Sequence, residues 1–148
     1  MIKDLLYKLP RRPSLTAADL EGLAASQRLA YACARDIARE LQEGWTEAQA
    51  ARLMDVYLRD HGVKTVFHKS FAWFGERARF DGMRHWLDFL PSSRRLRPGD
   101  CVILDTAPVY RGYPADIGYS WSLGDNPGVT AGRVFLAKLR AILLELFS

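Results

Sequence analysis

The sequence contains little cysteine: two residues, Cys33 and Cys101, in a chain of 148. They stand far apart and form neither a CxxC pair nor a paired Cys/His spacing, which argues against a disulfide-stabilised scaffold and against a zinc-finger type of domain. Cys33 falls in a helical pattern and Cys101 at the start of a strand pattern. We therefore expect both to be small core residues.

Long hydrophobic runs are also missing. The longest, such as Cys101–Leu104 and Ala141–Leu144, are far shorter than the roughly 20 residues that cross a bilayer, so we expect no membrane segment. The N-terminus carries an acid at Asp4 and has no small-residue cleavage site. This argues against a secretory signal and favours a cytoplasmic location.

Clustered positive charge is the third absence. The formal net charge is +4 and the isoelectric point is about 9.3, but the basic residues are scattered along the chain. The densest groups, Arg11-Arg12 and Arg94-Arg95 with Arg97, are typical of solvated loops. We therefore expect no nucleic-acid partner. A chain that did bind nucleic acid would show a steep salt dependence of that binding.

The composition is that of one globular domain, with 49% hydrophobic and 26% charged residues. Residues 1–13 are mixed and proline-ended, so we predict a leader segment there and a folded domain over residues 14–148. The tryptophans, including Trp73, Trp86 and Trp121, are expected in the core rather than in a pocket.

Two helices are predicted at the start of the domain. Apolar residues recur at spacings of three and four from Thr16, and Gly44 is expected to end this first helix. A capping box from Thr46 to Gln49 predicts the start of a second helix. That helix is expected to end near His61, with Gly62 as its stop.

Extended segments follow the helices. Val63–Phe67 and Phe71–Phe74 are predicted strands, Cys101–Asp105 is a predicted buried strand that ends in a carboxylate, and Tyr113–Leu123 is a further strand. A last helix is expected to start near Thr130. Two helices, a set of strands and a final helix indicate an α+β fold.

Two aspartates, Asp105 and Asp116, flank a predicted hairpin. If Arg111-Gly112 is its two-residue loop, the numbers of cross-strand partners sum to 223, Asp105 faces Gly118, and the aspartates are diagonal neighbours on one face. A loop at Tyr110-Arg111 would place them directly opposite each other. A three-residue loop would put them on opposite faces.

Two carboxylates on one face of an apolar sheet repel each other and are costly to desolvate, so a cation between them would explain their position. The alternative is that both are solvent-facing acids of an ordinary hairpin. Pro108 and Pro114 cannot donate to the ladder, so some bulging is expected beside the pair.

Three motifs carry a resemblance: Leu96-Arg-Pro-Gly-Asp100-Cys-Val-Ile-Leu-Asp105, then Arg111-Gly-Tyr-Pro-Ala-Asp116-Ile-Gly, then Ser122-Leu-Gly124. In spacing and order they resemble the pita-bread metallopeptidases, the family of methionine aminopeptidase, Xaa-Pro aminopeptidase and creatinase-like proteins. The resemblance implies the N-terminal half of a pita-bread fold. The chain departs from the family pattern at Ile117-Gly-Tyr-Ser120, where the family usually has Ile-Thr-Arg-Thr.

The resemblance also implies a function, that of a metallo-aminopeptidase-type hydrolase acting on a peptide N-terminus. Two divalent ions, manganese, cobalt, iron or zinc, would activate water against the first peptide bond. By position, Asp105 is implied as a ligand mainly of one ion and Asp116 as a bridge between two. His85 is the candidate for a catalytic, substrate-binding histidine, with His68 as its rival, while a purely structural role for His85 stays open.

The implied ligand set is incomplete. The family places one histidine and two glutamates after the aspartate pair, whereas this chain has no histidine and only Glu145 there. With two aspartates alone, water would fill most of the coordination positions of each ion. We therefore expect weak or no metal binding and little activity from a truncated domain of this kind. The apolar final helix predicts self-association or a complementary C-terminal half.

A second hypothesis is a non-catalytic pita-bread-like module that binds a protein or a peptide. Such a module would bind its partner without metal. Replacing both Asp105 and Asp116 by asparagine would then leave partner binding unchanged.

Overall fold

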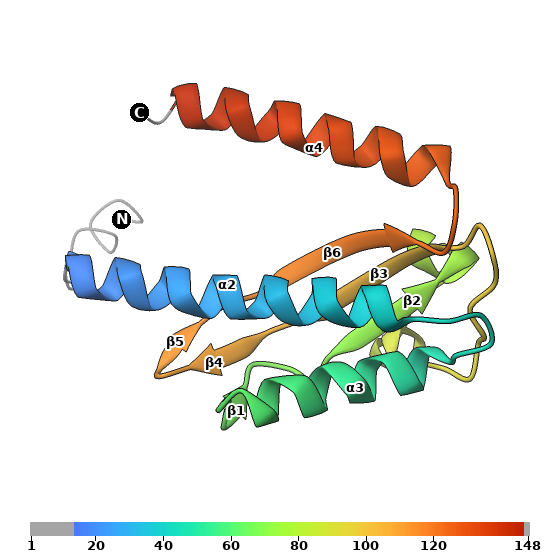
Figure 1. The fold of residues 1–148 in the computed structure, drawn as a ribbon, viewed down its shortest axis with the longest axis horizontal. Coiled ribbons are helices and arrows are strands. Elements are labelled where there is room, and N and C mark those ends of the chain that lie inside the picture. The colour runs from blue at the N-terminus through green and yellow to red at the C-terminus, as the bar shows by residue number, and fades with distance from the viewer. Residues whose placement is uncertain (1–13, 147–148) are drawn as a thin grey trace, which may run out of the picture.

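A computed structural model describes residues 14–146, so the leader predicted over residues 1–13 lies outside the described residues. Two helices come first, antiparallel strands follow, and one helix comes last, which confirms the predicted α+β class (Figure 1). The candidate site depends on how the first two helices cover the strands. None of the described helices combines the length and the apolar character needed to cross a bilayer.

The first helix, α2 (Ala17–Glu40), begins at a capping box. The Thr16 hydroxyl accepts a hydrogen bond from Asp19 N at 3.1 Å, and the Asp19 carboxylate accepts one from Thr16 N at 2.9 Å. The helix ends before Gly44 because the backbone of Leu41 is already extended, with φ −61° and ψ 132°. Its buried residues are mostly small, which lets the helix backbone approach the sheet closely.

The second helix, α3 (Glu47–Asp60), begins at the predicted capping box of Thr46 and Gln49. Its first residue, Glu47, is fully buried, and its carboxylate accepts hydrogen bonds from Phe74 N, from the Arg77 guanidinium and from the backbone and hydroxyl of Ser92. A buried carboxylate is tolerated only with such partners. This one ties α3 to the end of the central sheet.

The strands form two three-stranded antiparallel sheets. The central sheet has the order β2-β3-β6, and the smaller sheet has the order β1-β4-β5. The strands of the central sheet are β2 (Phe71–Phe74), β3 (Cys101–Thr106) and β6 (Ile117–Ser122), and those of the smaller sheet are β1 (Thr65–Val66), β4 (Pro108–Tyr110) and β5 (Tyr113–Pro114).

Burial alternates along β3. Val102, Leu104 and Thr106 are buried, whereas the residues between them, including Asp105, are partly exposed. Val102 and Leu104 belong to the same core cluster as the buried residues of α2 and α3, which cover this face of the sheet (Figure 1). The predicted strand is therefore present, but it is not buried on both faces. The strand is half-buried, and Asp105 lies on the face away from the core.

The last helix, α4 (Pro127–Leu146), begins at Pro127 rather than near Thr130, after Asn126 accepts a hydrogen bond from Val129 N at 3.1 Å. Only Val129 of this helix is buried. Figure 1 shows α4 extending beyond β6, apart from α2 and α3. Its exposed apolar residues are Val134, Phe135, Leu136, Leu139, Ile142, Leu143, Leu144 and Leu146.

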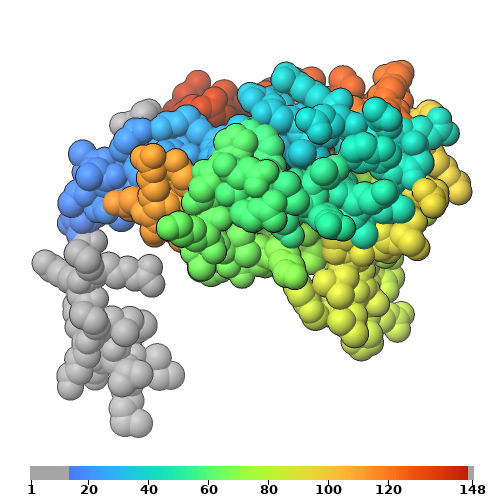
Figure 2. Space-filling model, turned by 60° about the horizontal axis from the view of Figure 1, so that its bottom comes forward, coloured from blue at the N-terminus to red at the C-terminus, as the bar shows by residue number. Residues whose placement is uncertain are grey.

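Two short 3-10 helices that no sequence pattern predicts, η1 (Gly75–Arg79) and η2 (Trp86–Phe89), lie between β2 and β3. The segment around residues 80–90 projects from the body of the molecule (Figure 2). Trp73 is buried as expected, but the side chain of Trp86 is exposed, so its predicted place in the core is wrong. The Trp86 ring instead packs edge-on against the Phe71 ring, with 5.6 Å between the ring centroids.

Candidate metal centre

The hairpin has the two-residue loop that puts both aspartates on one side. Arg111 and Gly112 have φ values of 53° and 87°, the two positive values that a tight hairpin loop requires. Tyr110 pairs with Tyr113, and Asp105 pairs with Gly118. In the β3–β6 ladder and in the β4–β5 ladder, the residue numbers of each pair sum to 223. This confirms the predicted register.

The ladder breaks beside the aspartates, where the prolines predict bulging. Ala107 and Ala115-Asp116 belong to no strand, although Ala115 N still donates to the Pro108 carbonyl at 2.9 Å. The break frees Asp116 from the sheet, and its side chain is 72% exposed, against 28% for Asp105. One carboxylate is thus held by the sheet and the other can be reached from solvent.

A third side chain, His68, joins the two aspartates. Its Nε2 atom lies 3.4 Å from Asp105 Oδ1 and 3.6 Å from Asp116 Oδ1. One ligand-type atom from each of the three residues lies within 4.8 Å of the others. Within residues 14–146, no other group of three histidine, cysteine, aspartate or glutamate side chains gathers so closely.

Hydrogen bonds on both sides of His68 hold it near Asp105. Phe67 N donates to the Ala107 carbonyl at 2.8 Å, and the hydroxyls of Ser70 and Thr106 share a buried hydrogen bond of 2.9 Å. Both bonds reach residues that directly follow Asp105. The segment that carries His68 is therefore fixed to the end of β3 where the carboxylate lies.

The electrostatics of Asp105 are unfavourable without a cation. Its Oδ1 atom is buried and has no hydrogen-bond partner. Burial raises the pKa of the Asp105 carboxyl, and the neighbouring Asp116 raises it further, although His68 opposes this. Two carboxylates and one imidazole are a donor set that divalent transition metals accept. These residues therefore fit a metal ion.

His85, the predicted substrate-binding histidine, lies outside this cluster. It precedes η2, and its backbone N–H donates to the Asp88 carboxylate at 2.9 Å. It is exposed, on the projecting loop of Figure 2. The next residue, Trp86, contacts Phe71, which pairs directly with Asp105, so the loop reaches the side of the sheet that bears the aspartate.

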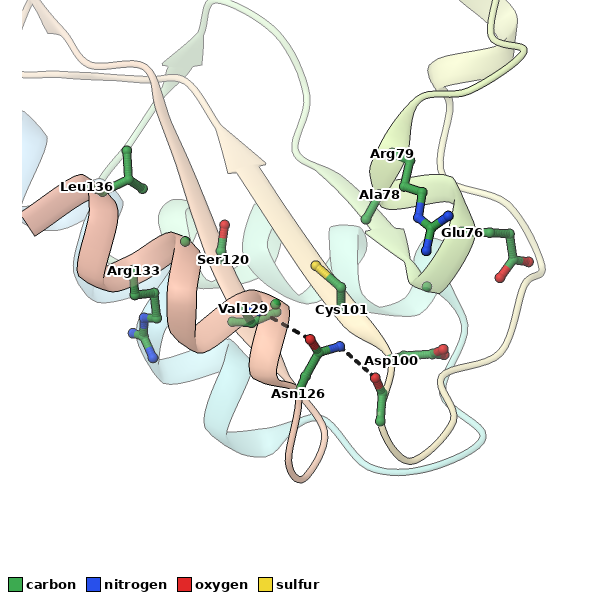
Figure 3. Close-up of a pocket in the computed structure, with 14 residues that line it drawn as sticks. Glu76, Ala78, Arg79, Asp100, Cys101, Ser120, Asn126, Val129, Arg133 and Leu136 are labelled. Atoms are coloured by element: carbon green, nitrogen blue, oxygen red, sulfur yellow. Dashed lines mark hydrogen bonds between the residues drawn. The ribbon is translucent and has the colours of Figure 1, made fainter. Parts of the chain in front are cut away.

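A cavity lies elsewhere, at the opposite end of β3. It has a volume of about 580 Å³ and is lined by Asp100, Cys101 and the first turns of α4 (Figure 3). Both ends of the Asn126 side-chain amide are hydrogen-bonded (Figure 3). The amide nitrogen donates to the Gly99 carbonyl at 2.8 Å, and the amide oxygen accepts from Val129 N. The cavity contains neither aspartate. We therefore place the candidate site at the cluster of His68, Asp105 and Asp116, because its side chains have the chemistry to bind a metal.

The sequence model described as Metallopeptidase family M24 matches residues 21–146. The chain belongs to metallopeptidase family M24. The match includes both aspartates and His68, so the cluster lies within the family's own domain. A comparison with curated proteins found no match.

Solved structures support the M24 fold. X-Pro aminopeptidase from Thermotoga maritima superposes on 85% of the chain with a TM-score of 0.67 and 18% identity. Dipeptidase PepE from Mycobacterium ulcerans superposes on 85% of the chain with a TM-score of 0.67 and 26% identity. Prolidase from Pyrococcus furiosus superposes on 84% of the chain with a TM-score of 0.66 and 22% identity. The chain spans about a third of these relatives, 33%, 32% and 34% of their lengths respectively.

Proposed function

We propose that the chain is a metallo-aminopeptidase-type hydrolase, of the Xaa-Pro or methionine aminopeptidase kind, in which Asp105 and Asp116 bind divalent metal. The observation that carries the proposal is the buried Oδ1 atom of Asp105, which has no hydrogen-bond partner and lies beside a second carboxylate. A cation satisfies the orphaned oxygen and removes the repulsion between the two charges. Manganese, cobalt, iron and zinc all suit such donors.

When bound, a pair of divalent ions supplies an activated water and polarises the carbonyl of the peptide bond. The chain positions the two carboxylates and leaves the approach open. Gly118, which pairs with Asp105, has no side chain, and no atom lies within 4 Å of the place where a Cβ would be. Asp116 is reached from solvent. A peptide can therefore approach from the face of the sheet opposite the helices.

The substrate that we propose is the N-terminus of a peptide. The matched structures are titled X-Pro aminopeptidase, dipeptidase and prolidase, which supports a peptide substrate of this class. His85 stays our candidate for holding that substrate. Its support is the position of its loop, whose Trp86 packs on Phe71, the direct strand neighbour of Asp105.

A complete dinuclear site needs more ligands than these residues offer. The resemblance implies one further histidine and two glutamates, and within residues 14–146 only His68, Asp105 and Asp116 gather as ligand-type side chains. We propose that a complementary polypeptide supplies the other ligands. The exposed apolar face of α4 is the surface that such a polypeptide would cover.

Peptide hydrolysis tests the proposal. An Xaa-Pro dipeptide is incubated in Mn²⁺ with the chain alone and with the chain plus a polypeptide carrying the C-terminal half of an M24 peptidase. We expect hydrolysis only in the mixture, and none when Asp116→Asn replaces the wild-type chain. Hydrolysis at full rate by the chain alone would contradict the need for further ligands, and hydrolysis that Asp116→Asn leaves intact would contradict the metal site.

A non-catalytic, partner-binding module is the second candidate function. It is favoured by the exposed apolar face of α4 and by Ile117-Gly-Tyr-Ser120, which departs from the family pattern after the second aspartate. Such a module predicts partner binding that survives both a chelator and Asp105→Asn with Asp116→Asn. Binding lost under either condition favours the hydrolase.

A further inference from the structure

We infer that His68 is a third protein ligand, so that His68, Asp105 and Asp116 together hold one divalent ion within this chain. The inference rests on the proposed function, because it takes the two aspartates as metal ligands. It goes beyond that function, since the ligand set implied by the resemblance contains no histidine ahead of the first aspartate.

The distances around His68 are close to those between ligands that share an ion. Ligand atoms about 2.1 Å from a metal lie about 3.0–3.5 Å from one another at right-angled to tetrahedral bond angles. Nε2 of His68 lies 3.4 Å and 3.6 Å from the two carboxylate oxygens. A direct charge-assisted hydrogen bond would be shorter, about 2.7–2.9 Å. Asp105 Oδ1 indeed has no hydrogen-bond partner.

The other ring nitrogen of His68 fixes the ring for ligation. Nδ1 lies 2.8 Å from the backbone carbonyl of Lys69. A carbonyl oxygen only accepts, so Nδ1 carries the proton and Nε2 faces the carboxylates. A backbone carbonyl bound to the distal ring N–H is the usual second contact of a metal-binding histidine, because it sets the tautomer and the ring orientation.

His61 provides a natural comparison within the same chain. Its Nδ1 also lies 2.8 Å from a backbone carbonyl, that of Tyr57. Within residues 14–146, however, His61 belongs to no cluster of ligand-type side chains. The Nδ1 contact alone therefore does not distinguish a ligand. What distinguishes His68 is the pair of carboxylates in front of Nε2.

A nitrogen donor changes which ion the site prefers. Two carboxylates alone suit Mg²⁺ or Mn²⁺, whereas an added imidazole favours Zn²⁺ and Co²⁺. We therefore expect one Zn²⁺ per chain to bind more tightly than Mn²⁺. Removing the imidazole should weaken Zn²⁺ binding more than Mn²⁺ binding, which an effect through folding alone would not do.

The experiment titrates the chelator-treated full chain with Zn²⁺ and with Mn²⁺ in a calorimeter, for wild type, His68→Gln, His61→Gln and Asp105→Asn with Asp116→Asn. In parallel, histidine ring ¹⁵N signals are followed during the Zn²⁺ titration of the wild type. We expect His68→Gln to weaken Zn²⁺ binding at least about tenfold and His61→Gln to leave it within about twofold. The Nε2 signal of His68 should move on saturation, and that readout needs no substitution.

The outcomes separate this inference from the proposed function. Unchanged Zn²⁺ affinity in His68→Gln, or a His68 Nε2 signal that does not move, overturns the assignment of His68. If the double aspartate variant loses binding at the same time, the proposed centre still stands. If the wild-type chain takes up neither ion, the inference fails together with the metal centre.

Discussion

At the scale of single residues, Asp105 is the position where the proposed metal site would cost the folded chain stability. Its carboxylate is partly buried, one oxygen has no hydrogen-bond partner, and a second carboxylate lies nearby. A carboxylate that is costly to bury and has an oxygen without a hydrogen-bond partner is typical of a binding site. Asp116 is mostly exposed and carries much less of this cost.

Asp105→Asn should therefore stabilise the metal-free protein while it removes metal binding. We expect the free energy of unfolding in a chelator to rise by about 1 kcal/mol, since a neutral amide costs less to bury than a carboxylate. Asp116→Asn is the matched control and should change it by less than about 0.5 kcal/mol. Urea unfolding in a chelator measures both, and a less stable Asp105→Asn would contradict the explanation.

A second residue-scale prediction concerns the behaviour in acid. Arg94 binds both Glu76 and Asp100, and its hydrogen bonds to Glu76 lower the pKa of that carboxyl from 4.5 to about 2. Because the folded pKa is depressed, the stabilisation is present above 4.5 and is lost as the pH falls toward about 2. The Glu76 side chain is largely exposed, so the contribution is at most about 1 kcal/mol.

Glu76→Gln should flatten this part of the pH profile. Between pH values of about 4.5 and about 2 the wild type should lose more stability than the variant. Chemical unfolding across this pH range measures the two slopes. Equal slopes would show that the ion pair contributes nothing to folding.

At the scale of elements, the hairpin could be predicted from the sequence and the position of His68 could not. The register follows from local chemistry, because a two-residue loop at Arg111-Gly112 fixes every pair in both ladders. His68 approaches Asp105 because the flanking residues Phe67, Ser70 and Phe71 pair with the end of β3 across a long stretch of chain. Nothing local to His68 specifies that pairing.

The half-burial of β3 was missed for a related reason. An apolar run such as Cys101–Leu104 looks the same whether helices cover both faces of a strand or one face. Here α2 and α3 cover one face, and Asp105 lies on the other. The exposure of Trp86 depends on η1 and η2, whose loop also has no periodic pattern to predict it.

A one-residue insertion tests the hairpin. Inserting a glycine between Arg111 and Gly112 makes a three-residue loop and should turn Asp116 away from Asp105. We expect Mn²⁺ affinity, measured by calorimetry, to fall at least about tenfold. Arg111→Gly is the control, because glycine accepts the positive φ of 53° and the loop keeps its length. An insertion variant with wild-type affinity would contradict the register argument.

At the scale of the whole molecule, the helices differ in how much of their apolar surface they bury. α2 and α3 bury their apolar faces against the sheet, whereas α4 exposes most of its apolar side chains. An apolar helix of this kind needs cover on more than one side. We expect it to bind another polypeptide, either a complementary half or a second copy of the chain.

Sedimentation tests the exposure of α4. Without a complementary polypeptide, the wild-type chain should sediment above its monomer mass of 16.8 kDa. Replacing Leu139, Leu143 and Leu146 by glutamate should shift it toward the monomer. Lys138→Glu with Arg140→Glu changes the charge of the same helix but keeps its apolar face, so this control should still associate. A wild-type chain that stays monomeric at every concentration would contradict this expectation.

The central claim is that Asp105 and Asp116 form the core of a metal centre, and metal uptake tests it most directly. A calorimetric titration of the chelator-treated chain with Mn²⁺ should show saturable binding, because His68 adds a third donor to the two aspartates, for which the sequence alone predicts weak or no binding. The same titration of Asp105→Asn with Asp116→Asn should show none, while its circular dichroism stays that of the wild type. Binding that survives in the double variant, or a wild-type chain that binds no metal, would contradict the account.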